Sequence, residues 1–181
     1  VICAEHMLTL VLRRAKQLAQ SGIEILATPA LSKFLNNEFD KKSFISTPNI
    51  IDSFCELDDS DIFSAMKGWR HHSDQVLSSL SSRLLDRKLF RIELRPHPFT
   101  TDEVNEKINL IATKWDLSID EASYFVSNHS IENKAYTPNG IIIKYKDGST
   151  RDFAESNDHF SLELLTKPVK KSFLCYPKNF E

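Results

Sequence analysis

The histidine and cysteine residues of this 181-residue chain form no familiar catalytic motif. None of the six histidines belongs to an HExxH sequence or is followed by aspartate, and the three cysteines form no CxxC pair. His71 and His72 are adjacent, and adjacent side chains on a helix point about 100° apart, so such a pair rarely binds one metal ion. We therefore predict no catalytic and no metal-ligating residue within the chain.

Four acidic residues fall within six positions: Glu56, Asp58, Asp59 and Asp61. Carboxylate oxygens are ligands for Mg²⁺ and Ca²⁺, so this segment is a candidate cation site. Its spacing is not that of an EF-hand, and it directly precedes a predicted helix, whose N-terminus acidic residues stabilise. We therefore interpret the cluster as a helix start with Asp59 or Ser60 as the N-cap.

Two basic stretches stand out against a net charge of −2. Residues 83–95 and 167–178 contain the candidate nucleotide-binding residues, which are Arg83, Arg87, Lys88, Arg91, Lys170 and Lys171. If the first and last strands of one sheet are neighbours, the two stretches converge and could bind a polyphosphate or the acidic face of another subunit. The alternative is a solubilising rim on an exposed sheet edge.

Composition excludes several classes of protein. Four glycines are too few for a glycine-rich phosphate loop, and no apolar run approaches the ~20 residues of a membrane span. An odd number of cysteines argues against a disulfide scaffold and for a reducing compartment, so we expect a cytoplasmic protein without a membrane partner. The helical pattern is already under way at Val1, without an initiator methionine, and we expect a piece of a longer protein.

Residues 1–87 are predicted to be helical. A broad apolar stripe runs from Ile2 to Ala19, and Ser21-Gly22 ends it. Further helices are predicted after Thr28-Pro29 and Thr47-Pro48, because proline is favoured at the first helical position. Ser60 and Ser73 are the predicted N-caps of the two helices that follow.

Residues 88–181 are predicted to mix strands with helices. The expected strands are 89–94, 123–127, 141–146, 149–153 and 171–176, with Asp147-Gly148 as a type I′ turn. Capping boxes at Thr100/Glu103 and Ser118/Glu121 begin two helices, and residues 155–166 are predicted to form another. The predicted fold is α+β: a helical segment followed by a ferredoxin-like split β-α-β sandwich, in which the first and last strands are neighbours.

Long segments of the chain resemble one bacterial subgroup of HD-domain phosphohydrolases, which are relatives of deoxynucleoside triphosphate triphosphohydrolases. The segments that carry the resemblance are residues 4–35, 57–94, 120–128, 133–136, 141–153 and 167–177. The wider family shares an L-x-D-x-x-I/F helix, here Leu57 to Phe63, and an R-x-L-F strand, here Arg87 to Phe90. The resemblance is to the C-terminal part of these enzymes and covers most of the chain.

The resemblance implies that residues 1–87 continue a helical HD core and that residues 88–181 form a C-terminal domain. In that family the core binds a divalent metal through a His, a His-Asp pair and a later Asp. These ligands are expected upstream of Val1, so no catalytic residue or cofactor is assigned here. The family's C-terminal region packs on the core, forms subunit contacts and places basic residues near effector nucleotides, and Arg87, Lys88 and Arg91 lie in the matching segment.

Three functional hypotheses follow for the chain. The first is the supporting and regulatory region of a nucleotide-hydrolysing phosphohydrolase, without activity of its own. The second is a module that binds an effector nucleotide through the two basic stretches. The third is a dimerisation domain. The expected partners are the chain's own HD domain, a further copy of the chain and a nucleotide effector.

Overall fold

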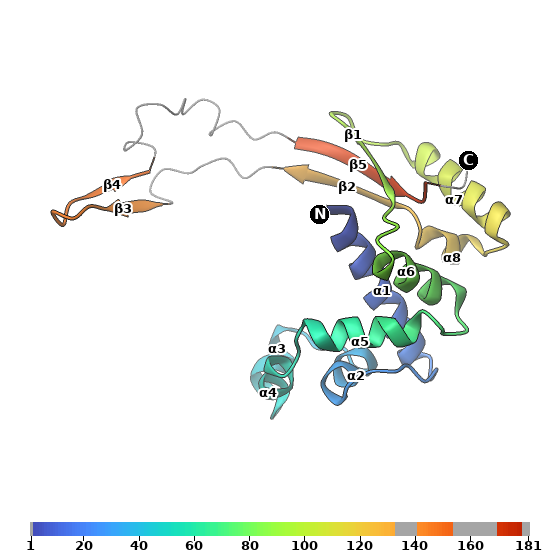
Figure 1. Ribbon diagram of the computed structural model, residues 1–181, viewed down its shortest axis with the longest axis horizontal. Coiled ribbons are helices and arrows are strands. Elements are labelled where there is room, and N and C mark those ends of the chain that lie inside the picture. Colours follow the sequence, from blue (N-terminus) through green and yellow to red (C-terminus); the bar gives the residue numbers. More distant parts are fainter. Residues whose placement is uncertain (1, 133–140, 154–169, 179–181) are drawn as a thin grey trace.

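The computed structural model describes residues 2–132, 141–153 and 170–178, which form eight helices and five strands. The helical half contains α1 (Ile2–Gln20), α2 (Pro29–Asn36), α3 (Lys41–Ser46), α4 (Ile50–Cys55), α5 (Asp59–Trp69) and α6 (Gln75–Leu85). Figure 1 shows α1 running beside α6, between the sheet and the layer that contains α2 and α5. No helix among the described residues is long and apolar enough to cross a membrane.

The predicted caps at Thr28, Thr100 and Ser118 are confirmed, and each side-chain oxygen accepts a backbone N–H of its helix. Three other predicted caps were wrong. Asp58 caps α5 and Asp74 caps α6, instead of Asp59 or Ser60 and Ser73. Asp58 lies three positions before Asp61 and forms a capping box with it, and the Asp74 carboxylate accepts stronger hydrogen bonds than the Ser73 hydroxyl would. The third, Thr47, ends α3 instead of starting α4.

Three antiparallel strands form the main sheet in the order β1-β5-β2. They are β1 (Arg91–Arg95), β2 (Ser127–Glu132) and β5 (Lys170–Tyr176), with α7 (Thr101–Trp115) and α8 (Ile119–Ser123) between the first two along the chain. Strand β5 lies between β1 and β2, which is the split β-α-β arrangement. The predicted α+β class and the pairing of the first and last strands are therefore confirmed.

The second strand begins four residues later than predicted. Residues 119–123 are helical because the capping box of Ser118 and Glu121 starts α8, and only from Ser127 does the chain pair with β5. Strands β3 (Ile142–Lys144) and β4 (Thr150–Asp152) form the predicted hairpin as a separate two-stranded sheet. The helix predicted over residues 155–166 lies outside the described residues.

The hairpin turn is not type I′, which requires two successive positive φ angles. Among the residues of this turn, only Gly148 has a positive φ, of 86°. Its N–H donates to the Tyr145 carbonyl at 3.0 Å, and the Tyr145 N–H donates to the Ser149 carbonyl at 2.9 Å. This is the three-residue loop in which a type I turn is followed by glycine in the left-handed region.

One cluster of buried side chains joins the helical half to the main sheet. It includes Val11 of α1, Leu77 of α6, Phe125 and Phe173, all of which are fully buried. Trp69 closes the α5 side of this core, and its indole N–H donates to the Leu26 carbonyl at 2.8 Å. The sheet and the helices therefore support each other, and the C-terminal end of α6 is held close to β1.

Candidate functional site

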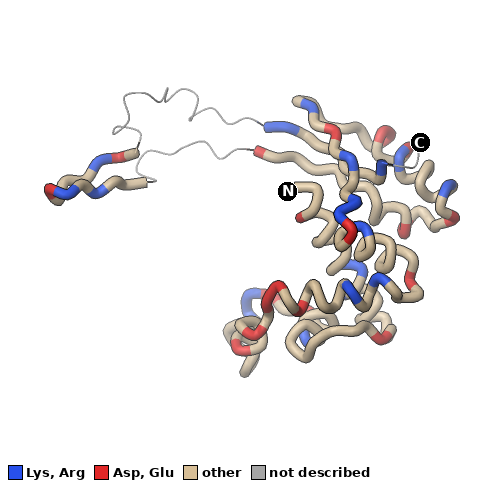
Figure 2. The backbone as a smooth tube through the Cα atoms, in the orientation of Figure 1, with Lys and Arg blue, Asp and Glu red and all other residues tan. Residues whose placement is uncertain are grey.

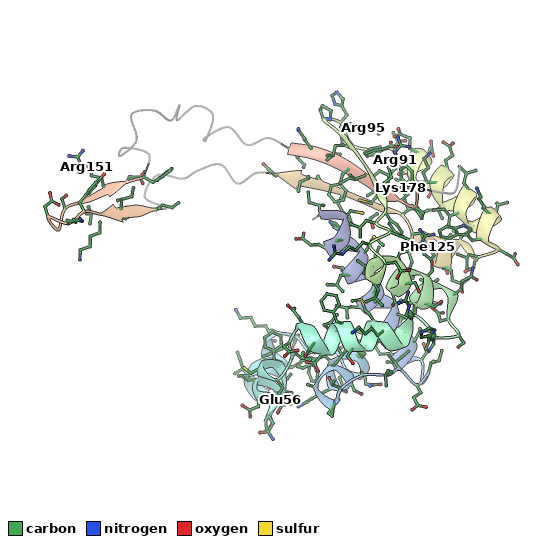
Figure 3. The ribbon with its side chains drawn as sticks, viewed as in Figure 1. Glu56, Arg91, Arg95, Phe125, Arg151 and Lys178 are labelled. Atoms are coloured by element: carbon green, nitrogen blue, oxygen red, sulfur yellow. The ribbon has the colours of Figure 1, made fainter. Side chains whose placement is uncertain are left out.

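A small basic hollow of about 230 Å³ lies where α6 ends and β5 leaves the sheet. Its lining consists of Arg83, Arg87, Lys88, Leu89 and Lys178. We call this hollow the basic pocket. Figure 2 shows the blue segments that gather around the end of α6, and Figure 3 labels Lys178.

Arg83 is the most buried cation of the basic pocket. Its guanidinium carbon lies 5.1 Å from the centroid of the Trp115 ring, and its Nε donates to the Ser79 hydroxyl at 3.4 Å. Burial lowers the pKa of Arg83, and no carboxylate of the described residues forms an ion pair with it. An arginine keeps its charge even so, and a bound anion would therefore compensate the lost hydration.

Arg87 is held beside Arg83 by an unusual helix end. Its φ is 56°, in the left-handed region where glycine is the usual residue. The N–H of Arg87 donates to the Leu84 carbonyl at 3.1 Å, and that of Lys88 donates to the Arg83 carbonyl at 2.8 Å, which is a Schellman motif. A non-glycine residue at this position costs roughly 1 kcal/mol or more, and such positions are frequent at ligand sites.

One acidic side chain borders the basic pocket. Asp86 pairs with Arg70, which directly follows α5, at 2.8 Å and with Lys88 at 3.6 Å. These cations lower the pKa of Asp86, and the Arg70 hydrogen bond is the main cause. Lys88 is thus partly neutralised. Arg83, Arg87 and Lys178 form no ion pair with a carboxylate of the described residues, so the pocket has an excess of positive charge.

The six predicted nucleotide-binding residues are only partly brought together. Arg83, Arg87 and Lys88 line the basic pocket, whereas Arg91 lies on β1 with its Nε 3.9 Å from a Glu93 oxygen.

Lys170 and Lys171 do not join the basic pocket. They pair with Glu132 and Ile131 at the opposite end of the sheet, roughly 20 Å away along β5.

The expected convergence was therefore wrong for Lys170 and Lys171, although the strands are neighbours. Strand β5 runs antiparallel to β1 in a register that places Arg91 opposite Tyr176. The end of β5 near α6 is therefore its C-terminal end, and Lys178 is the lysine that reaches the pocket. Antiparallel pairing of the predicted strands would have pointed to Lys178 instead of the two earlier lysines.

A larger and mostly apolar hollow of about 560 Å³ adjoins the basic pocket. Leu8, Phe63 and Leu85 contribute to its wall, and Arg87 and Leu89 line both hollows. One ligand with a flat apolar part and a charged part could occupy the two together. That combination is typical of a nucleotide, whose base stacks on apolar surface while its phosphates contact arginine and lysine.

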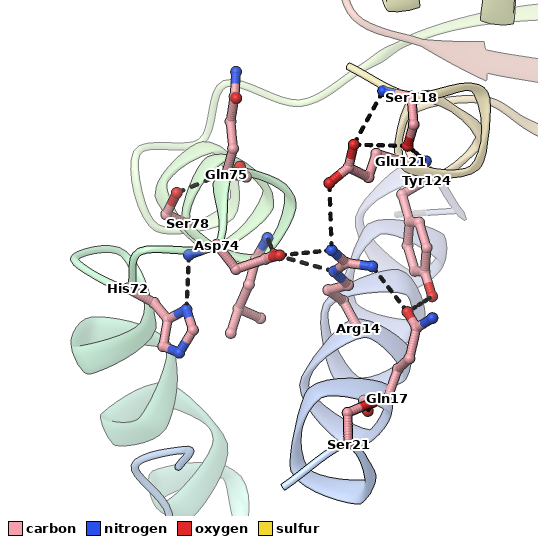
Figure 4. Close-up of polar contacts among 11 residues, drawn as sticks. Arg14, Gln17, Ser21, His72, Asp74, Gln75, Ser78, Ser118, Glu121 and Tyr124 are labelled. Atoms are coloured by element: carbon pink, nitrogen blue, oxygen red, sulfur yellow. Dashed lines mark hydrogen bonds and ion pairs between the residues drawn. The ribbon is translucent and has the colours of Figure 1, made fainter. Parts of the chain in front are cut away.

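A network centred on Arg14 fixes α6 against α1 and α8, as Figure 4 shows. Arg14 binds both carboxylate oxygens of Asp74 at 2.6 and 3.1 Å and lies 3.7 Å from Glu121. It also donates to Gln17, whose side-chain oxygen accepts from the Tyr124 hydroxyl at 2.8 Å. Because α6 contains Arg83 and ends just before Arg87, this network positions the basic pocket.

The residues considered as metal ligands have structural partners. Asp58 and Asp61 form the capping box of α5, and the His72 Nδ1 accepts the Asp74 N–H at 2.9 Å. Over residues 2–132, 141–153 and 170–178, no three His, Cys, Asp or Glu side chains come together to hold a metal ion. The acidic cluster is therefore a helix start, as interpreted from the sequence.

His6 of α1 stacks on His129 of β2, with ring centroids 4.5 Å apart, and both rings contact Phe173. Burial lowers the pKa of His129, and the charges of His6 and Arg13 lower it further. The folded protein therefore favours neutral His129. The contribution of neutral His129 to the stability of the fold is complete above the ordinary pKa of 6.5, and it is lost as the pH falls through the lowered pKa of His129.

We expect the variant His129→Gln to lose less stability than the parent chain when the pH is lowered from 7.5 to 5. Glutamine cannot take up the proton that disfavours the folded state. Urea unfolding at the two pH values measures this difference, with His97→Gln, at an exposed loop position, as the matched control. An equal loss of stability between pH 7.5 and 5 in the His129→Gln variant and the unsubstituted chain would contradict this explanation of the histidine pair.

No protein-family model matches the chain. The chain is similar to a phosphohydrolase of Bacteroides thetaiotaomicron, whose crystal structure shares 40% sequence identity with it at a TM-score of 0.86. This match covers 98% of the chain and 44% of the phosphohydrolase. The uncharacterized protein YwfO of Bacillus subtilis is 28% identical over 128 residues, which are 70% of the chain and 27% of YwfO. The chain thus spans less than half the length of either relative.

Proposed function

We propose that the chain is the supporting and nucleotide-binding region of an HD-superfamily phosphohydrolase that acts on deoxynucleoside triphosphates. The observation that carries this proposal is the 40% identity, over nearly the whole chain, to a phosphohydrolase more than twice as long. The catalytic metal ligands of the parent would then lie in the part of the relatives that this chain does not cover.

The basic pocket supports a nucleotide as the ligand of this region. Arg83, Arg87 and Lys178 supply positive charge, and the adjoining apolar hollow offers a surface for a base. Guanidinium groups bind phosphate oxygens in pairs, and Arg83 is already oriented by its stacking on Trp115. The bound nucleotide would act as an effector, which is the role that the family resemblance implies for basic residues of this region.

We expect hydrolytic activity in the longer parent protein and none in the 181-residue chain alone. We expect the 181-residue chain to release no triphosphate from dGTP with Mg²⁺, Mn²⁺ or Co²⁺, whereas the parent that includes the sequence upstream of Val1 releases it. The measurement is chromatographic separation of triphosphate and nucleoside products. Turnover by the chain that is abolished by a substitution within it would overturn the proposal, as would a parent inactive on all phosphoesters.

A purely structural dimerisation domain is the second candidate function. The exposed apolar side chains of α4 and α5, which include Ile51 and Phe63, favour an association role. This candidate predicts no effect of nucleotide on the melting temperature, whereas the basic pocket predicts a rise. Thermal unfolding with and without nucleotide therefore separates the two functions.

A further inference from the structure

Three large apolar side chains of α4 and the first half of α5 are exposed. Ile51, Phe54 and Phe63 are each more than half exposed there. We call residues 50–63 the acidic face, because they contain five carboxylates and no lysine or arginine. One cation lies beside this stretch: the Lys33 ammonium donates to the Ser53 hydroxyl at 3.0 Å. Large exposed apolar side chains among carboxylates that outnumber the cations are typical of a protein interaction surface.

The hairpin of residues 141–153, which we call the arm, has the opposite character. It contains three basic residues, Lys144, Lys146 and Arg151, against two acidic ones. Alternate residues of a strand share a face, so Ile141, Ile143 and Tyr145 lie together, and Arg151 lies opposite Ile143 in the partner strand. Ile141 is more than half exposed, and Tyr145 is exposed as well.

The arm is a short two-stranded hairpin. Its strands contain three residues each, and isolated two-stranded hairpins are marginally stable at best in water. Figure 1 draws the arm beyond the end of the three-stranded sheet, away from α4 and α5. In Figure 3 the labelled Arg151 on the arm and Glu56 at the end of α4 likewise lie on separate parts of the chain.

We propose that the arm of one copy docks on the acidic face of a second copy, so that two copies exchange arms about a two-fold axis. The apolar side chains Ile141, Ile143 and Tyr145 would cover Ile51 and Phe54, while Arg151 and the arm lysines meet the surrounding carboxylates. Both surfaces belong to every copy, and a reciprocal exchange therefore buries both and closes the assembly at two. The proposal does not depend on the activity of the parent.

Charge reversal tests this pairing because the side chains of Arg151 and Glu56 are both exposed. The Arg151→Glu variant and the Glu56→Arg variant are each expected to raise the dimer dissociation constant at least about tenfold, as like charges then meet across the interface. Sedimentation equilibrium over a range of concentrations measures the constant. High salt is expected to weaken the dimer of the unsubstituted chain as well, since the charges lie at the rim of the proposed interface.

Mixing the two single variants gives the sharpest result. In a dimer with one copy of each, the two introduced side chains meet at one contact with their charges exchanged, and the original Arg151 meets the original Glu56 at the other. The mixture is therefore expected to dimerise about as tightly as the unsubstituted chain.

An apolar pair of variants provides the matched control for this interface. Ile51→Ser is expected to weaken the dimer, whereas Ile119→Ser, at an exposed site on α8, leaves it unchanged. A chain that stays monomeric at all concentrations, or a mixture of the charge variants no tighter than either variant alone, would overturn the proposal.

Discussion

Replacing Asp74 with alanine is expected to lower the free energy of unfolding by about 3 to 4 kcal/mol. The carboxylate holds Arg14 through two hydrogen bonds and also accepts the Leu77 N–H at 2.8 Å as the N-cap of α6. Both side chains of the ion pair are about seven-eighths buried. The variant therefore loses the cap and leaves the Arg14 guanidinium without its main counter-charge.

One further variant separates the N-cap of Asp74 from its charge, and a second serves as a control. Asp74→Asn retains an oxygen for the N-cap but removes the charge, so its loss should be intermediate. Asp59→Ala removes an exposed carboxylate from the first turn of α5 and should cost well under 1 kcal/mol. Urea unfolding monitored by circular dichroism provides all three values. A loss below about 1 kcal/mol for Asp74→Ala would contradict the importance of the Arg14 network.

A nucleoside triphosphate at 100 times its dissociation constant is expected to stabilise the chain by about 2.7 kcal/mol. For a domain of this size that corresponds to a rise in melting temperature of roughly 5 to 10 °C. The expected cause is contact of the phosphates with Arg83, Arg87 and Lys178 in the basic pocket. Thermal unfolding in the presence of dGTP, with deoxyguanosine as the uncharged comparison, measures the effect.

The variant Arg83→Gln should lose most of this nucleotide-dependent rise, because it removes the most buried cation of the pocket. The matched control is the double variant Lys170→Gln/Lys171→Gln, which removes two positive charges at the other end of β5. This control should keep the full rise. An equal loss in both variants would mean that nucleotide responds to overall charge and that the basic pocket is not its site.

Much of the fold follows from local signals in the sequence. Thr100 with Glu103 and Ser118 with Glu121 identify two helix starts correctly, because a capping box depends on residues three positions apart. The alternating strand near Leu89 and the last strand of the chain were found by their pattern of apolar residues. The caps Asp58 and Asp74 were missed because several polar neighbours could serve, and for Asp74 the contact with Arg14 is distant in the sequence.

The candidate site was predictable only in part. Arg83, Arg87 and Lys88 share one helix end, so their proximity is a local property of the sequence. That Lys178 lines the basic pocket, and not Lys170 or Lys171, depends on strand register, which no local pattern fixes. The left-handed φ of Arg87 has no sequence signal either, since glycine is the residue expected at that position.

The central claim is that this chain binds a nucleotide without reacting with it. Equilibrium dialysis of the purified chain against dGTP and Mn²⁺, followed by chromatography of the nucleotide recovered with the protein, tests both parts in one measurement. We expect saturable binding by the unsubstituted 181-residue chain, weak binding by Arg83→Gln, and recovery of dGTP intact. Recovery of deoxyguanosine and triphosphate, or the absence of bound nucleotide at millimolar concentration, would contradict it.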